Sequence, residues 1–236
     1  MAPKKPRRHA GEHDLIEAFD LPGCPVCRLA HESVDAFFTS VAYEQVNDLD
    51  LRERIRNDGG FCPVHARRFL ELPLGPLATA IIYRDVLVTT KRRIEAAAPR
   101  RRASLLASLT RGRLGSPPGE QSGRAGCVAC DVLSEAEGRH LDVLCERLAR
   151  PAVRERYTRS GGLCLPHLER ALQRAADAES PLRETAVSAL GAIVTELEEY
   201  IQKHDYRFHT PDWDDAKDVP ERALDRAVGR NAEPRG

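Results

Sequence analysis

The chain has 236 residues, of which 31% are charged, and equal numbers of acidic and basic residues give a formal net charge of zero. This balance does not favour a protein that wraps nucleic acid, and no apolar run approaches the roughly 18 residues of a membrane span. The basic segment at residues 1–9 is not followed by an apolar region, so it does not predict a secretory signal. We therefore expect a cytoplasmic protein, in a compartment that keeps thiols reduced.

The first half of the chain has the apolar spacing and turn residues of a series of helices. Leu21-Pro-Gly23 ends the first helix, Gly59-Gly60 can end the third by taking positive φ, and Pro63 suits the first turn of the fourth. The expected helices lie over residues 13–19, 28–46 and 76–97, with a short helix between the caps Asn47-Asp48 and Gly59-Gly60 and another that Pro63 opens and that ends near Leu70.

The second half repeats this plan after a stretch rich in glycine, serine and proline at residues 112–126, which predicts a linker. In the long helix that begins at Ser180-Pro181, apolar residues recur every three or four positions and form one stripe. No alternating β-branched run predicts a strand, so we expect an all-α protein. The expected helices of this half lie over residues 128–148, 151–160, 164–178, 180–203 and 220–228.

A pattern of cysteine and histidine occurs twice in the chain. Cys24-Pro-Val-Cys27 is followed by Gly60-Phe-Cys62-Pro-Val-His65, and Cys127-Val-Ala-Cys130 is followed by Gly162-Leu-Cys164-Leu-Pro-His167. The spacing inside the two copies differs by one residue. A repeat of about 100 residues is longer than the unit of a solenoid and predicts two related domains.

We therefore expect two pseudo-symmetric helical modules. The predicted organisation is a basic disordered tail at 1–11, a first module at 12–111, the linker at 112–126, a second module at 127–203 and a C-terminal tail at 204–236.

Three thiolates and one imidazole form a closed tetrahedral shell of the kind that holds structural Zn²⁺. We expect two zinc ions per chain, each bound by the four ligands of one copy and closing the loop between its C-x-x-C and its C-x-x-H. The predicted metal ligands are Cys24, Cys27, Cys62, His65, Cys127, Cys130, Cys164 and His167.

Other interpretations of these residues stay open. An iron–sulfur cluster is the main alternative to zinc, although such clusters usually take four cysteines. The C-x-x-C pairs could also be redox-active dithiols. Cys145 lies outside the repeat and is expected to be a small buried hydrophobe. Glu137 and His140 have a di-iron-like spacing but no counterparts in the other copy, so we expect a solvated helix face.

A closed shell leaves no coordination position for a substrate, which argues against a hydrolase. The sequence also has no phosphate-binding glycine loop, nucleophile elbow or paired catalytic carboxylates. We expect a non-enzymatic, zinc-stabilised interaction protein with a protein partner. The alternatives are a redox-responsive zinc and thiol switch or an iron–sulfur protein, and nucleic-acid binding is disfavoured.

The repeated motifs, together with Lys203-His-Asp-Tyr-Arg-Phe208 after the last long helix, resemble a family of uncharacterised bacterial proteins catalogued as a domain of unknown function. The resemblance extends from about His13 to Val228. It implies a bacterial source and a two-module helical body, and it implies no activity. Val128 departs from the C-P-x-C form of the first copy, a change that leaves the ligands intact.

Overall fold

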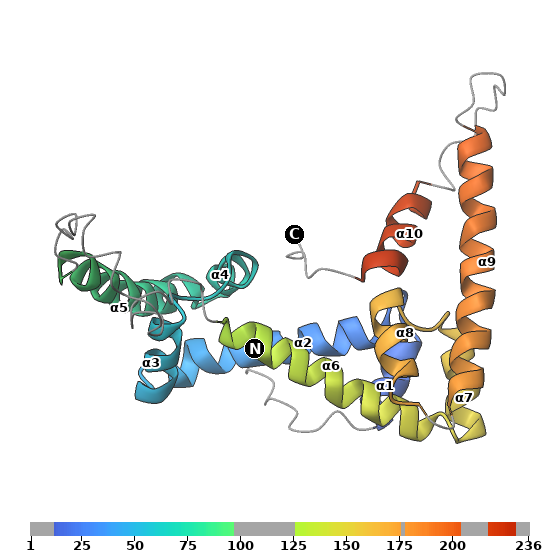
Figure 1. Ribbon diagram of the computed structural model, residues 1–236, viewed down its shortest axis with the longest axis horizontal. Coiled ribbons are helices and arrows are strands. Elements are labelled where there is room, and N and C mark those ends of the chain that lie inside the picture. The colour runs from blue at the N-terminus through green and yellow to red at the C-terminus, as the bar shows by residue number, and fades with distance from the viewer. Residues whose placement is uncertain (1–11, 97–125, 176–177, 204–216, 230–236) are drawn as a thin grey trace, which may run out of the picture. The chain divides into compact units, whose positions relative to one another are not determined.

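The computed structural model describes residues 12–96, 126–175, 178–203 and 217–229. Within these ranges every regular element is a helix, which confirms the prediction of an all-α protein (Figure 1). The elements are α1 (Glu12–Phe19), α2 (Pro25–Ser40), the π-helical turn η1 (Val41–Gln45), α3 (Leu49–Asn57), α4 (Pro63–Leu70), α5 (Gly75–Ala96), α6 (Val128–Arg147), α7 (Pro151–Arg159), α8 (Leu165–Leu172), α9 (Glu179–Lys203) and α10 (Val219–Val228).

The chain forms two compact units. The terminal unit comprises Met1–Asp35 with Leu133–Gly236, and the central unit comprises Ala36–Val132. The terminal unit thus joins segments from both halves of the sequence, whereas the sequence predicted consecutive modules. The predicted tail at 1–11 and nearly all of the predicted linker lie outside the described residues.

The helices of the two sequence copies follow one another in the same order with similar lengths. Helices α3 and α7 each have 9 residues, and α4 and α8 each have 8. This agreement follows from the repeated turn and capping signals, such as the proline in the first turn of both α4 and α8. Pseudo-symmetry in three dimensions stays a prediction.

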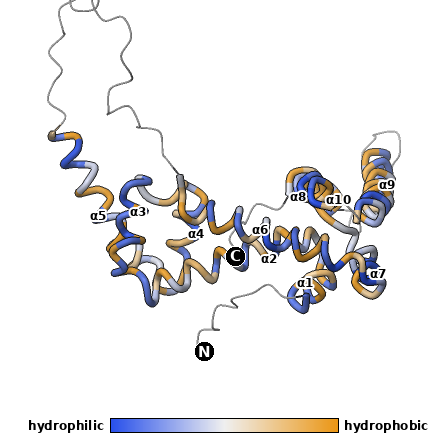
Figure 2. The backbone as a smooth tube through the Cα atoms, turned by 60° about the horizontal axis from the view of Figure 1, so that its bottom comes forward, coloured by the Kyte–Doolittle hydropathy of each residue, from blue (hydrophilic) through white to orange (hydrophobic). Residues whose placement is uncertain are grey.

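The core of the terminal unit is mainly aliphatic and lies between α1, the first part of α2, α6, α7, α8 and α9. Its fully buried side chains include Leu144, Leu148 and Leu182, and Phe19 packs edge-on against Tyr157 with ring centroids 5.9 Å apart. Figure 2 shows hydrophobic and hydrophilic residues interleaved along these helices, as amphipathic packing requires.

The core of the central unit is aromatic. Phe38, Phe61 and Phe69 pack against one another with centroids 5.2 to 5.3 Å apart, and α5 adds buried Ile82. Such pairs stabilise a core beyond the area that they bury.

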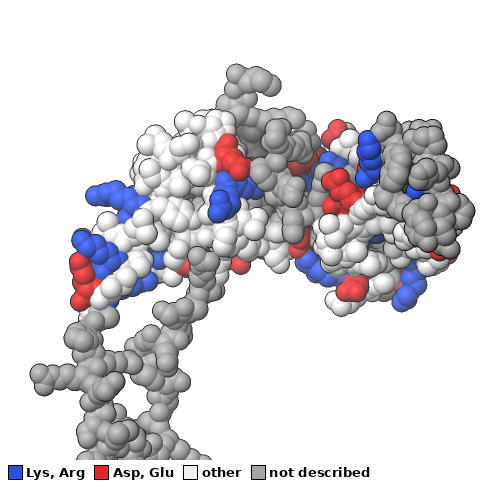
Figure 3. Space-filling view, turned by 90° about the horizontal axis from the view of Figure 1, so that it is seen from above, with Lys and Arg blue, Asp and Glu red and all other residues white. Residues whose placement is uncertain are grey.

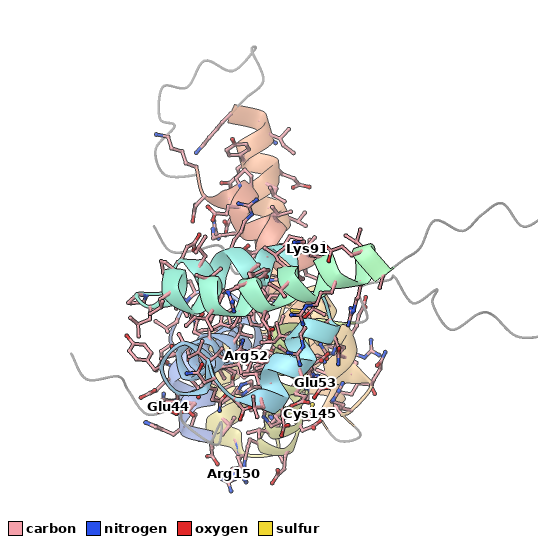
Figure 4. All side chains as sticks on the ribbon, turned by 90° about the vertical axis from the view of Figure 1, so that its left-hand side faces the viewer. Glu44, Arg52, Glu53, Lys91, Cys145 and Arg150 are labelled. Atoms are coloured by element: carbon pink, nitrogen blue, oxygen red, sulfur yellow. The ribbon has the colours of Figure 1, made fainter. Side chains whose placement is uncertain are left out.

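The contact of α5 with α3 is polar as well as apolar. Asp85 forms ion pairs with Arg52, labelled in Figure 4, and with Arg56. At the turn after α3, Gly60 has a φ of +100°, and a Cβ there would lie 2.9 Å from Tyr83. Only glycine therefore suits this close approach.

No helix among the described residues is long and apolar enough to cross a membrane. On the face drawn in Figure 3, acidic and basic side chains lie near one another on the described surface.

We expect Phe69→Ala to destabilise the central unit by about 3 to 5 kcal/mol, because it removes a fully buried aromatic ring from a packed cluster. Urea unfolding with excess zinc measures the change. Leu70→Ala is the matched control in the same helix, where the side chain is 47% exposed and a much smaller effect is expected. Equal losses in the two variants would contradict the assignment of this core.

Candidate metal centres

Both C-x-x-C motifs lie at the beginning of a helix. Cys24 precedes α2 and Cys127 precedes α6, and the second cysteine of each motif lies in the first helical turn. The carbonyl oxygen of Cys127 accepts hydrogen bonds from the N–H groups of Cys130 and Asp131, at 2.8 and 3.1 Å. This turn directs two sulfurs of one motif toward a common point.

The two C-x-x-H motifs also begin helices, with almost the same backbone. Cys62 is the N-cap of α4 with φ −62° and ψ 162°, and Cys164 is the N-cap of α8 with φ −65° and ψ 159°. The histidine three residues later lies one turn along the helix. Each of the four helix starts therefore supplies two donors, and none supplies the four that a closed shell needs.

The structure brings all eight predicted ligands into two groups. Site A consists of Cys24, Cys27, Cys164 and His167, and site B consists of Cys62, His65, Cys127 and Cys130. Within each group the ligand atoms all lie within 4.8 Å of one another.

The expected pairing within each sequence copy is wrong. Each site takes its C-x-x-C from one copy and its C-x-x-H from the other. The physical reason is that site A lies wholly in the terminal unit and site B wholly in the central unit, and each unit is built from segments far apart in sequence.

The donors of site A surround a single point. The Nδ1 atom of His167 lies 3.5, 3.4 and 3.2 Å from the sulfurs of Cys24, Cys27 and Cys164. The sulfurs of Cys27 and Cys164 are 3.7 Å apart. Cys27, Cys164 and His167 are buried, and Cys24 is partly buried.

Site B has the same geometry. The Nδ1 atom of His65 lies 3.3, 3.6 and 3.3 Å from the sulfurs of Cys62, Cys127 and Cys130. The sulfurs of Cys62 and Cys130 are 3.8 Å apart. The imidazole packs edge-on against Phe38, with centroids 5.9 Å apart.

These separations fit one tetrahedral ion. Zn–S bonds of about 2.3 Å and Zn–N bonds of about 2.0 to 2.1 Å give donor separations of about 3.8 Å between sulfurs and about 3.5 Å between sulfur and nitrogen. A disulfide would need sulfurs about 2.05 Å apart, and all seven cysteines are free. Both sites could therefore hold a metal ion.

Hydrogen bonds among the donors of site A hold protons there and shift the pKa values of these groups. Burial raises the pKa of the Cys24 thiol, but hydrogen bonds with Cys164, Cys27 and His167 outweigh burial and leave that pKa well below its usual value. Burial lowers the pKa of His167, yet hydrogen bonds with Cys164, Cys24 and Glu137 raise it to about 11. An entering cation must displace these protons, so metal affinity falls in acid.

The thiols of site B also shift one another's pKa values. Burial and the neighbouring Cys127 raise the pKa of Cys130 to about 12. Burial also acts to raise the pKa of Cys127, but a hydrogen bond with His65 prevails and lowers it.

Glu137 contacts one of the predicted metal ligands, a contact that the sequence did not predict. Its Oε1 lies 3.2 Å from Nε2 of His167, the ring nitrogen that faces away from the sulfurs, and Arg170 binds its other oxygen. Hydrogen bonds with His167 and Arg170 oppose burial and lower the pKa of Glu137. A carboxylate in this position orients a metal-binding histidine and makes its ring more basic. The expected solvated face was therefore wrong for Glu137, which is mostly buried.

The expectation of a solvated helix face was also wrong for His140, which is only 4% exposed. Its ring hydrogen-bonds the Leu29 backbone, and Nε2 has no partner among the described residues. Burial and then the charge of Arg139 lower the pKa of His140 to about 4. Cys145, labelled in Figure 4, lies outside both sites, partly buried, with Sγ 3.7 Å from the carbonyl oxygen of Ala171.

Glu137→Gln should weaken metal binding at site A by about 10-fold or more, because the amide orients the ring of His167 without strengthening its basicity. Competition with a chromophoric chelator measures the affinity of each site. Glu135→Gln, an exposed change two residues earlier in α6, is the control and should leave both affinities unchanged. Identical affinities in Glu137→Gln and wild type would contradict the role of this carboxylate.

His140 should make the terminal unit less stable in acid. Because its pKa is lower in the folded chain than the ordinary 6.5, the stabilisation is complete above about pH 6.5 and is lost as pH falls toward 4. The loss attributable to His140 should reach about 1 kcal/mol at pH 5.5. Urea unfolding of wild type and His140→Asn at pH 8 and 5.5 checks this. The same pH dependence in both proteins would refute it.

The comparisons with known proteins give a family and no activity. Residues 14–234 match a family model described as a family of unknown function, DUF6062. A relative from Caldicellulosiruptor sp. (strain Rt8B.4), described as an uncharacterized 23.9 kDa protein in the xynA 3' region, is 33% identical over 202 residues, which cover 82% of this chain and 88% of that protein. No solved structure gives a significant match. On both the family match and this relative, the protein belongs to the DUF6062 family.

Proposed function

We propose that this protein binds two structural zinc ions, each of which ties together helix starts from distant parts of the chain. The observation that carries the proposal is the grouping of eight donors into two sets of three sulfurs and one nitrogen. An ion at site A would join the starts of α2 and α8, and an ion at site B would join the starts of α4 and α6.

The energetic reason is the same at both sites. Structural zinc contributes roughly 10 to 16 kcal/mol of binding free energy in small zinc-finger peptides at pH 7, and such a site does not exist in the unfolded chain. Because the ion would bind the folded chain and not the unfolded chain, its binding free energy would add to the free energy of unfolding, and it would join segments as far apart in sequence as Cys27 and Cys164. The metal would act on folding and would supply no reaction.

The separations of the donors favour zinc over a cluster of several irons. The ligands of a cluster bind different irons and must spread around it, whereas the ligand atoms of each site here lie within 4.8 Å of one another. A single tetrahedral ion satisfies that spacing, and Zn²⁺ takes three cysteines and a histidine without any redox change. An iron–sulfur protein is therefore the less favoured alternative.

A filled site of four protein ligands leaves no position for a substrate, which supports a non-enzymatic role in binding a protein partner. The described surface of α9 offers a place for such a partner. Val187, Val194 and Ile201 recur every seven residues on this helix and are 71%, 49% and 66% exposed. We place the protein in the cytoplasm, where free thiols persist.

The metal content tests this proposal. Protein purified without oxygen should contain about two zinc ions per chain, one for each closed shell, and should be colourless. Visible absorption with iron and sulfide would favour the cluster instead. Protein that contains no metal and binds none would contradict the proposal.

Removal of the metal should destabilise the fold. We expect a chelator under reducing conditions to lower the thermal midpoint strongly and to reduce the near-ultraviolet circular dichroism, because the ions no longer hold the helix starts together. Zinc added afterwards should restore both signals. An unchanged midpoint in the metal-free protein would mean that the ions do not stabilise the fold.

A thiol switch is the second candidate, favoured by the partly exposed Cys62 and Cys130, whose sulfurs lie 3.8 Å apart. Two thiolates would reduce one molecule of hydrogen peroxide to two of water, taking up two protons, and would form one disulfide while the metal leaves. Micromolar peroxide should then release one zinc ion, and a thiol reductant should restore binding. Retention of both ions after exposure to peroxide would exclude this candidate.

A further inference from the structure

The two sites differ in how the protein surrounds their sulfurs. At site A, Cys27 and Cys164 are buried and only Cys24 is partly exposed. At site B, Cys127 is buried, but both Cys62 and Cys130 are partly exposed. A competing chelator reaches a metal ion by contacting the ion or its ligands, so exposed sulfurs make release faster.

Helix α10 covers part of site A. It contacts both α8 and α9, beside which Figure 1 draws it, and the residue that ends it lies against the site. A Cβ on Gly229 would lie 3.4 Å from Sγ of Cys164 and 3.6 Å from Sγ of Cys27. Gly229 therefore lies beside two of the three sulfurs, with little more room than one methyl group between its backbone and them.

Val219, Arg222 and Arg226 help to hold α10 in place. Val219 at its start is buried, and Arg222 in its first half forms an ion pair with Glu196 of α9. Near its end, Nη1 of Arg226 donates a 2.7 Å hydrogen bond to the carbonyl oxygen of Leu163, the residue before Cys164. Helix α10 is thus hydrogen-bonded to the backbone next to a ligand of site A.

Site A also has a carboxylate beside its histidine. The contact of Glu137 with His167 holds the ring in place, and Arg170 holds Glu137. In the sequence repeat, the counterpart of Glu137 is Val34, whose side chain cannot orient a histidine by hydrogen bonding. Orientation of a ligand by a neighbouring carboxylate strengthens metal binding.

We propose that site A retains its metal ion as a permanent part of the fold, that site B exchanges its ion with the solution, and that α10 is the cover that slows release from site A. This inference rests on the proposed zinc binding at both sites. It assigns any metal transfer or thiol reaction of this protein to Cys62, Cys127 and Cys130.

The wild-type protein tests the order of release directly. Zinc-loaded protein is mixed with 4-(2-pyridylazo)resorcinol and N-ethylmaleimide, and the alkylated cysteines are mapped by mass spectrometry over time. We expect Cys62, Cys127 and Cys130 to be alkylated together as the first zinc ion leaves, while Cys24, Cys27 and Cys164 stay protected. Earlier alkylation of the site A cysteines, or equal rates for both sets, would overturn the inference.

The cover is tested by loosening α10 in the full chain. The double variant Arg222→Ala/Arg226→Ala loses the ion pair with Glu196 and the hydrogen bond to Leu163, so local opening of α10 should increase. The slow phase, which is zinc release from site A, should then accelerate about tenfold or more. The fast phase, which is zinc release from site B, should not change. Arg183→Ala, which removes an exposed pair within α9, is the control and should leave both phases as they are.

An unchanged slow phase in the double variant would overturn the role of α10. The failure of this inference is distinct from the failure of zinc binding. Protein that binds no zinc overturns both proposals, whereas protein that binds two ions and releases the one from site A first overturns only the inequivalence of the sites.

Discussion

Each helix start with a C-x-x-C or C-x-x-H motif in this protein offers two metal donors, and a closed tetrahedral shell requires four. A shell can therefore form only when two helix starts meet. The structure satisfies this constraint by joining a C-x-x-C from one sequence copy to a C-x-x-H from the other at both sites. The division of the chain into two units matches this pairing, because the terminal unit contains all four ligands of site A and the central unit contains all four ligands of site B.

The two units support equivalent ligand geometry with different interiors. Aliphatic side chains such as Leu144 and Leu148 form the core of the terminal unit, whereas Phe38, Phe61 and Phe69 pack together beside His65 in the central unit. A carboxylate orients the histidine at site A, and an aromatic ring packs against the histidine at site B. Such differences around similar ligands are the means by which a protein gives two ions different affinities and rates of release.

The sequence predicted the helices and the ligands because both depend on local signals. Glycines with positive φ at 59–60 and 161–162 and prolines in first turns mark helix ends and starts wherever the chain goes. Repetition identified the eight ligands, since unrelated cysteines would not recur with histidines at matched places. The same local information could not predict the pairing, because Cys24 and Cys27 can form a shell with either C-x-x-H.

Glu137 and His140 are residues of the second copy whose environment the repeat does not predict. The counterparts of both residues are apolar in the first copy, which suggested that neither had a function. A better signal lies within α6 itself. Leu141 and Leu144 follow Glu137 by four and seven residues and are fully buried, so Glu137 shares a face with the core. A carboxylate on such a face needs a partner, here His167 and Arg170.

The pairing of ligands is the central claim, and ¹¹³Cd substitution followed by proton–cadmium correlation spectroscopy tests it most directly. Scalar coupling connects each cadmium resonance only to protons of its own ligands. We predict one resonance coupled to Cys24, Cys27, Cys164 and His167, and a second coupled to Cys62, His65, Cys127 and Cys130. A resonance that couples Cys24 and Cys27 to Cys62 and His65 would contradict the exchange between copies and restore two self-contained modules.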